Sequence, residues 1–196
     1  MKYSVAVIIP TYNRARTLRR ALESVFEQTR QPEEVCVIDD GSTDSTEVLV
    51  KEHFSQVIYI RQQNLGVSAA RNAGVEATSS DCVAFLDSDD EWLPKKLEVQ
   101  LSELEASPDI RLVHSDEIWI RNGKRVNQMH KHKKSGGYIF PQCLPLCAIS
   151  PSAAVLHRSL LADVGGFDES LPACEDYDLW LRICCKERVL YVDNPL

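Results

Sequence analysis

Three carboxylates follow a single apolar run within four residues of one another. The stretch FLDSDDEW (residues 85–92) places Asp87, Asp89 and Asp90 directly after a run that is typical of a buried strand. Carboxylates this close repel one another, and the repulsion lowers stability unless a positive group offsets it. The pattern therefore indicates either a solvated acidic turn or a site that binds something positive.

Two other polar stretches follow apolar runs of their own. They are PTYNR (residues 10–14) and DDGSTD (residues 39–44). One such stretch could be an ordinary surface loop. Three of them at equivalent positions indicate one site built from three loops.

The first 110 residues alternate between strand-like and helix-like patterns. Short apolar runs at residues 4–10, 35–40, 57–60 and 82–87 predict strands, and apolar residues at helical spacing follow each of them. This alternation predicts right-handed crossovers and a mostly parallel sheet covered by helices, an α/β fold. Such sheets bind ligands beyond the carboxyl ends of their strands, where the three polar stretches lie.

The second half of the sequence is less regular. Strands are predicted there at residues 111–120, 152–157 and 188–193, and a helix is predicted at residues 175–185, before the last strand. The pair Asn122-Gly123 predicts a β-hairpin. The polar, basic stretch QMHKHKKS (residues 128–135) predicts a mobile loop.

Composition narrows the class of protein. The 196 residues suffice for one large domain, and 44% of them are hydrophobic, which is enough for a sizeable core. A net charge of -7 argues against nucleic acid as the main partner. No apolar run approaches the roughly 18 residues of a membrane span, and the opening MKYSVAVIIP is interpreted as a first strand rather than a signal peptide.

The seven cysteines show no C-x2-C pair and so match no zinc pattern. Several fall inside strand or helix patterns, where a free thiol behaves as a small hydrophobe. They predict structural thiols in a reducing, cytoplasmic compartment.

In their order and spacing, six stretches resemble the family 2 glycosyltransferases with the GT-A fold: PTYNR, VIDDGSTD, NLGVSAARNAG, FLDSDD, GGFDE and EDYDLWLR. The resemblance implies an enzyme that transfers a sugar with inversion from a nucleotide-diphospho-sugar, expected to be a UDP-sugar. The implied acceptor is a glycan or lipid-linked saccharide, as in surface polysaccharide or cell-wall synthesis. Residues 1–110 would form the donor half and residues 111–196 the acceptor and catalytic-base half of one domain. The implied location is the cytoplasm, with peripheral attachment to the inner membrane face left open.

The resemblance also assigns roles around the D-x-D stretch. Asp87 would face the ribose, and Asp89 would hold Mn2+ or Mg2+, with Asp87 as a second ligand. Ser88 would line the same site, and Asp90 would be a helper. A divalent cation can bridge a diphosphate to carboxylates, so these roles agree with the chemistry of the cluster.

The nucleotide would lie on the other two stretches and the helix beyond them. Pro10, Thr11 and Tyr12 would border the base, with the Tyr12 ring against uracil. Either Asp39 or Asp40 would accept a hydrogen bond from the ring N–H. Gly66 opens the helix that carries Arg71. That arginine would meet the base or a phosphate, or else form a structural ion pair with Asp40 or Asp87.

The stretch EDYDLWLR supplies the carboxylate that inversion requires. By resemblance, Asp176 is the general base that removes the acceptor hydroxyl proton. The alternative is a role for Asp176 at the start of a helix, where carboxylates are favoured. Glu175 and Trp180 are expected near the acceptor or in support of the helix.

Four other classes can be weighed against this one. A sugar-phosphate nucleotidylyltransferase needs a Gly-rich loop after its first strand, and PTYNR has no glycine. A dehydrogenase needs G-x-G-x-x-G there. A haloacid-dehalogenase-type phosphatase carries its acidic motif on the first strand rather than the fourth. A non-catalytic nucleotide-sugar-binding domain would need no Asp176.

The end of the sequence raises one further expectation. The chain stops shortly after the predicted strand at residues 188–193. In the family that it resembles, more residues normally follow, often with an R-x-H-like segment that folds over the donor. We therefore expect a catalytic domain truncated at its C-terminus.

Overall fold

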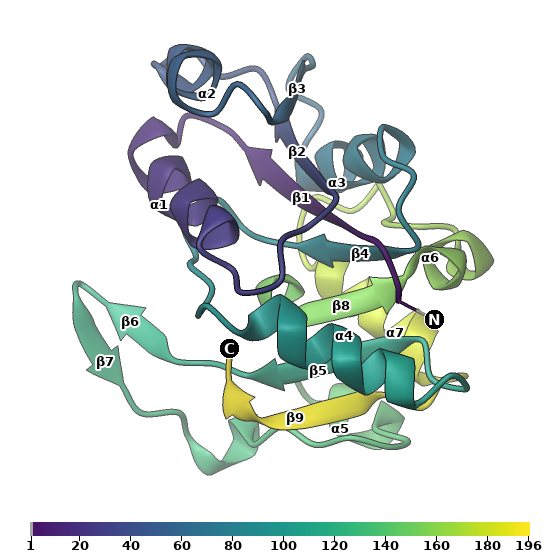
Figure 1. The fold of residues 1–196 in the computed structure, drawn as a ribbon. Helices are drawn as coiled ribbons and strands as arrows, with labels where there is room; N and C mark the ends of the chain where they lie inside the picture. Colours follow the sequence, from purple (N-terminus) through teal and green to yellow (C-terminus); the bar gives the residue numbers. More distant parts are fainter. Residues whose placement is uncertain (1) are drawn as a thin grey trace.

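A computed structural model describes residues 2–196 and contains one large sheet, one small sheet and helices on both faces of the large one (Figure 1). The strands are β1 Val5–Thr11, β2 Glu34–Asp39, β3 Ile58–Arg61, β4 Cys82–Phe85, β5 Leu112–Asp116, β6 Trp119–Arg121, β7 Lys124–Val126, β8 Ala154–His157 and β9 Leu190–Pro195. The α-helices are α1 Ala15–Phe26, α2 Thr46–His53, α3 Val67–Glu76, α4 Lys96–Ala106, α5 Phe140–Cys143, α6 Arg158–Val164 and α7 Glu175–Cys184.

One seven-stranded sheet runs through both halves of the chain, in the order β3-β2-β1-β4-β8-β5-β9. β8 is antiparallel to both of its neighbours, β4 and β5, and the remaining pairs are parallel. The carboxyl end of β5 therefore lies at the same edge of the sheet as those of β1, β2 and β4. The predicted mostly parallel α/β architecture is confirmed.

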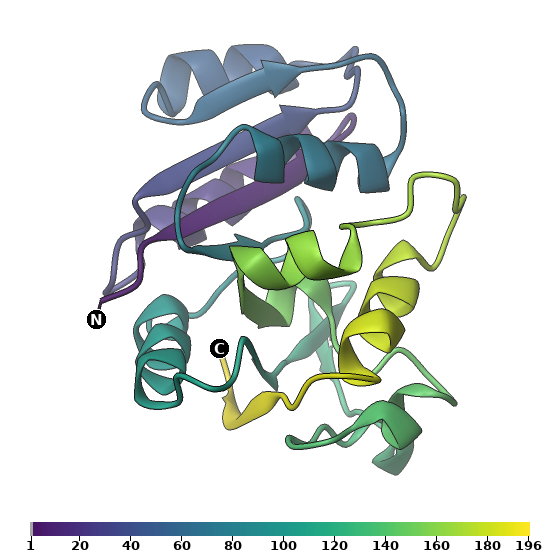
Figure 2. The ribbon, with the colours of Figure 1, turned by 90° about the vertical axis from the view of Figure 1, so that its right-hand side faces the viewer.

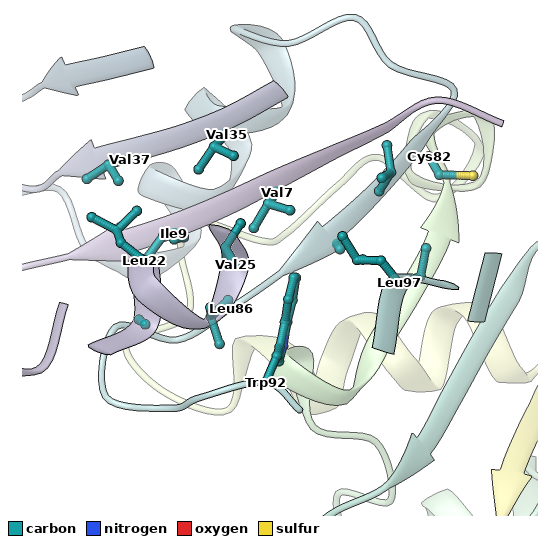
Figure 3. Packing of buried hydrophobic residues seen from close by; sticks show 14 of the residues in the cluster. Val7, Ile9, Leu22, Val25, Val35, Val37, Cys82, Leu86, Trp92 and Leu97 are labelled. Atoms are coloured by element: carbon teal, nitrogen blue, oxygen red, sulfur yellow. The ribbon is translucent and has the colours of Figure 1, made fainter. Parts of the chain in front are cut away.

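The alternation of side chains along β1 supplies both faces of the core. Val5, Val7 and Ile9 point to one face and pack with α1, α2 and α4 (Figure 3). Ile8 points to the other face, which helices α3, α5, α6 and α7 cover (Figure 2). Because β1 is buried on both faces, its sequence is a continuous apolar run rather than an alternating one.

Helix α3 packs so closely on β1 that only a glycine fits at the contact. A Cβ on Gly74 would overlap the side chain of Ile8 well inside van der Waals contact. We therefore expect Gly74→Ala to lower the free energy of unfolding by about 1–3 kcal/mol, as overpacking usually does, although alanine favours helix. Urea denaturation measures this. Unchanged or increased stability would mean that α3 can move away from the sheet.

The second half departs from the prediction in several places. The single strand predicted at residues 111–120 is two strands, because the chain leaves the large sheet after a register shift at Asp116 and then pairs with itself as β6 and β7. β8 begins at Ala154, because the residues before it form a short 3-10 helix, Pro151–Ala153. The helices α5 and α6 were not predicted; both are short, at four and seven residues.

The hairpin prediction is confirmed, with Asn122 and Gly123 both at positive φ between β6 and β7. The basic stretch that follows is less free than a mobile loop. Lys134 is buried and lies 3.0 Å from Glu117, and the His114 ring is 2.9 Å from the carbonyl of Ser135. The end of the stretch is thus anchored to β5.

All seven cysteines are free thiols, and four of them are buried. This agrees with their predicted packing role. Within residues 2–196, none of the helices has the length and apolar character needed to span a bilayer.

Candidate functional site

Three polar loops meet at one edge of the sheet, because β1, β2 and β4 are parallel and neighbours. The amide of Asn13 donates a hydrogen bond to the Ser42 hydroxyl at 2.8 Å, which joins the loops after β1 and β2. Arg14 Nη1 lies 3.2 Å from Asp89 Oδ2, which joins the loops after β1 and β4. The prediction that the three stretches form one surface is confirmed.

The end of β1 presents one exposed ring. Tyr12 is 48% exposed, whereas Pro10 and Thr11 are buried. Thr11 Oγ1 finds no hydrogen-bond partner among residues 2–196. The Tyr12 ring is therefore available to stack on a flat ligand, whereas Pro10 and Thr11 present little surface to one.

Asp39 has no exposed surface and serves the loop that follows β2. Its carboxylate accepts a hydrogen bond from the Ser42 amide at 2.8 Å and another from the Tyr59 hydroxyl. These contacts fix the turn between β2 and α2. Asp39 is thus a supporting residue in this geometry.

Asp40 is the more accessible of the acidic pair, at 5% exposure. Its carboxylate accepts hydrogen bonds from the amides of Leu65 and Gly66, each at 2.9 Å, and from Gln62 Nε2 at 2.8 Å. Gly66 has a φ of 93°, a backbone conformation that is unfavourable for residues other than glycine. Asp40 therefore shapes the turn into α3, and it is the better placed of the pair to meet a ligand.

Arg71 joins the loop after β4 to helix α7. Nη2 lies 2.7 Å from Asp87 Oδ1, and Nη1 lies 2.7 Å from Glu175 Oε1. The guanidinium carbon is 5.1 Å from the ring centroid of Phe167, within cation–π range. Burial opposes the positive charge, but the two carboxylates outweigh it, so the pKa of Arg71 is raised.

This geometry separates the roles that the sequence left open for Arg71. Its side chain is 4% exposed, and both terminal nitrogens are held by carboxylates. The ion pair with Asp87 is present, whereas Asp40 makes its contacts elsewhere. A direct contact of Arg71 with a base or phosphate stays a prediction, and it would require these two ion pairs to rearrange.

The acidic cluster after β4 is organised by one serine. Ser152 accepts a hydrogen bond from the Asp87 amide at 3.1 Å and donates one to Asp90 Oδ2 at 2.6 Å. Ser88 is buried beneath the turn, while Asp89 is exposed. Loss of water around the carboxylate raises the pKa of Asp90. The hydrogen bond from Ser152 lowers this pKa, and the negative charges of Asp87 and Asp89 raise it further.

The repulsion among these carboxylates is offset by two arginines, Arg14 at Asp89 and Arg71 at Asp87. Within residues 2–196, no three His, Cys, Asp or Glu side chains form a group that could hold a metal ion by themselves. Mg2+ in particular is usually held by one or two carboxylates together with substrate phosphates. Asp87 and Asp89 offer the carboxylate oxygens that such a shared arrangement needs, and Arg14 and Arg71 are the cations beside them in this structure.

Asp176 lies in the first turn of α7, next to the Glu175 that Arg71 holds. Its Oδ1 accepts a hydrogen bond from the amide of Tyr177 at 2.7 Å, and the Cys147 thiol lies 3.6 Å from its Oδ2. Burial, and then the negative charge of Asp176, raise the pKa of Cys147 to about 12. The thiol therefore stays protonated and donates to the carboxylate.

The two predicted supporting residues differ in position. Glu175 is partly buried and faces Arg71. Trp180 has no exposed surface and packs in the core beneath α7. A contact between Trp180 and an acceptor is therefore ruled out in this structure, and its role is to hold the helix in place.

Three residues of the site were not predicted from the sequence: Arg14, Cys147 and Ser152. Arg14 belongs to PTYNR, but the sequence assigns it no role, because only the fold brings it to Asp89. Cys147 comes from the irregular segment before β8, and Ser152 stands at the start of the strand predicted at residues 152–157, where nothing in the pattern indicates a contact with the acidic cluster. Only their contacts in space assign them to the site.

Comparisons with known proteins identify the family to which this chain belongs. The model of a family described as glycosyl transferase family 2 matches residues 6–165. An uncharacterized glycosyltransferase of Rickettsia felis is 34% identical over 194 residues, which cover 98% of this chain and 32% of that protein. The chain thus spans about a third of this relative.

A second relative has a more specific name. The Escherichia coli UDP-Glc:alpha-D-GlcNAc-diphosphoundecaprenol beta-1,3-glucosyltransferase WfgD is 33% identical over 183 residues, which cover 92% of this chain and 70% of that protein.

Solved structures agree on the fold. Staphylococcus aureus TarS 1-349 in complex with UDP-GlcNAc has a TM-score of 0.75 at 23% identity, over 98% of this chain and 59% of that one. The Pyrobaculum calidifontis mannosyltransferase PcManGT, in complex with GDP-Man and Mn2+, has a TM-score of 0.75 at 21% identity, over 99% and 56%. Both likenesses concern the arrangement of the chain, which is the predicted GT-A fold.

Proposed function

Because the chain belongs to glycosyl transferase family 2, we propose that it transfers a sugar from a nucleotide-diphospho-sugar to a saccharide acceptor. The observation that carries this proposal is the Arg71 bridge. It holds the donor-side carboxylate Asp87 against Glu175, the neighbour of the candidate base Asp176. Donor binding and proton removal would thereby take place at one edge of the sheet.

The expected donor is a UDP-sugar. A relative is named for UDP-Glc and a structural neighbour contains UDP-GlcNAc. In this chain the exposed Tyr12 ring would stack on the uracil. Asp40 would accept a hydrogen bond from the ring N–H through a remaining lone pair, and Asp87 would accept one from a ribose hydroxyl.

A divalent cation would be shared between protein and donor. Asp89, with Asp87 or Asp90 beside it, would hold Mn2+ or Mg2+, and Arg14 would have to move away from Asp89 for this. The bound ion would neutralise charge on the diphosphate as the sugar leaves. A neighbouring structure contains Mn2+, which agrees with this assignment.

Asp176 would act as the general base. Its carboxylate would take the proton from the acceptor hydroxyl while that oxygen attacks the anomeric carbon from the face opposite the diphosphate, which inverts the configuration. The Cys147 thiol would hold the carboxylate in place. The acceptor is proposed to be a lipid-linked saccharide, since the relative WfgD is named for one.

Donor binding can be tested directly by calorimetry with UDP. We expect Mn2+ to raise UDP affinity by about tenfold or more, which corresponds to about 1.4 kcal/mol. The diphosphate otherwise lies beside three carboxylates, and like charges repel. Asp89→Asn should remove most of the benefit of Mn2+.

Glu91→Gln is the matched control for that experiment, since Glu91 is a neighbouring exposed carboxylate that pairs with Arg20. It should leave the effect of Mn2+ intact. Equal UDP affinity with and without Mn2+ would overturn the metal assignment. Failure of UDP to bind under either condition would contradict the proposed donor.

A further inference from the structure

The segment that leaves β5 has an unusual charge for this chain. Residues 118–134 contain six Lys or Arg and no Asp or Glu, although the whole chain carries a net charge of -7. The last of the six, Lys134, is buried against Glu117. The other five are exposed and form no ion pair within residues 2–196: Arg121, Lys124, Arg125, Lys131 and Lys133.

Apolar side chains are interleaved with these cations. Four of them are exposed: Ile118 at 39%, Ile120 at 62%, Val126 at 40% and Met129 at 58%. Ile120 stands opposite Arg125 in the hairpin, so an apolar and a basic residue share one face. Exposed apolar residues that gather rather than scatter mark an interaction surface.

The hairpin formed by β6 and β7 has no partner in the large sheet and projects from the body of the molecule (Figure 1). It follows β5, whose carboxyl end lies at the same edge of the sheet as those of β1, β2 and β4. Whatever binds the hairpin is therefore held at the edge that carries the candidate site.

We propose that residues 118–133, here termed the basic hairpin segment, bind the surface of an anionic lipid bilayer. Unpaired cations supply attraction to anionic headgroups, and the apolar side chains between them supply burial at the headgroup boundary. A soluble polyanion would satisfy the cations but would leave Ile120 and Met129 in water. The inference is independent of the proposed transfer reaction, although it would bring a lipid-linked acceptor to the site.

Sedimentation with vesicles tests this. We expect the chain to bind vesicles that contain phosphatidylcholine and phosphatidylglycerol and to bind phosphatidylcholine vesicles weakly. Lys124→Glu combined with Arg125→Glu should lower the partition coefficient by about 30-fold, on the scale of roughly 1 kcal/mol for each basic residue near an anionic surface. Ile120→Ser combined with Met129→Ser should lower it too, and binding by this variant should be more sensitive to salt.

A matched control is Lys2→Glu combined with Lys186→Glu. It changes the net charge by the same amount, at two exposed lysines that are distant from the hairpin in sequence. It should keep vesicle binding within a few-fold of the parent. UDP affinity should be unchanged in every variant, which shows that they are folded and separates this test from that of the donor site.

The proposal is overturned if the parent chain binds both kinds of vesicle equally, or neither. It is also overturned if the control and the hairpin variant lose binding alike, since net charge alone would then be responsible. Retention on heparin that depends on Lys124 and Arg125, without binding to vesicles, would assign the segment to a soluble polyanion instead.

Discussion

Asp176→Asn is expected to lower the rate of sugar transfer by about 100-fold or more, the usual scale for loss of a general base. The asparagine amide cannot take up the proton of the attacking hydroxyl. UDP affinity should stay within a few-fold of the parent, because the donor loops are held by contacts that do not include Asp176. Steady-state transfer kinetics and UDP calorimetry on the same preparation measure both quantities.

Asp178→Asn is the control for that variant. Asp178 lies in the same first turn of α7 and pairs with Arg182 at 2.7 Å. A role at the helix start would be shared by the two carboxylates, whereas proton removal would not. Transfer by the Asp176 variant at the parent rate would reduce Asp176 to a helix-terminus residue. Equal losses in both variants would point to damage to α7.

Arg71→Met is expected to lower the free energy of unfolding by about 3–5 kcal/mol, because it leaves two partly buried carboxylates without their shared partner. Methionine keeps much of the apolar volume against Phe167, so the loss reports mainly on charge. The loop after β4 and the start of α7 should then separate. Urea denaturation gives the stability, and UDP calorimetry shows whether the donor site survives.

Arg111→Met is a close match for comparison. Arg111 also bridges two carboxylates, Asp163 and Glu187, each at 2.6 Å, but it is 28% exposed and Asp163 is 59% exposed. Exposed ion pairs contribute about 0–1 kcal/mol, so this variant should lose far less stability. Similar losses in the two variants would mean that burial of Arg71 has no special role.

The sequence predicted the first half of the fold well because its signals are local. β1 is apolar on both faces, and Gly66 and the residues around it mark the start of α3. The three polar stretches were placed together correctly, because parallel neighbours bring their carboxyl ends to one edge.

The remainder depended on contacts between distant residues. Ser152 reaches the acidic cluster from more than sixty residues away, and Cys147 reaches Asp176 from 29 residues away. Neither has a local pattern that could reveal this. Asp39 and Asp40 could not be separated by sequence, because burial and the contact with Tyr59 distinguish them only in the folded chain. Arg71 likewise has two plausible roles until its carboxylates are seen.

The position of β8 has a consequence for how the chain comes together during synthesis. β8 fills the gap between β4 and β5, yet 68 residues separate the end of β4 from its start. Until Ala154–His157 has emerged from the ribosome, β4 keeps an open edge and β5 lacks its bridge to the rest of the sheet. Open strand edges invite pairing between chains, and distant pairings form slowly. The interval between translation of β4 and arrival of β8 is therefore when a nascent chain of this topology is most exposed to aggregation.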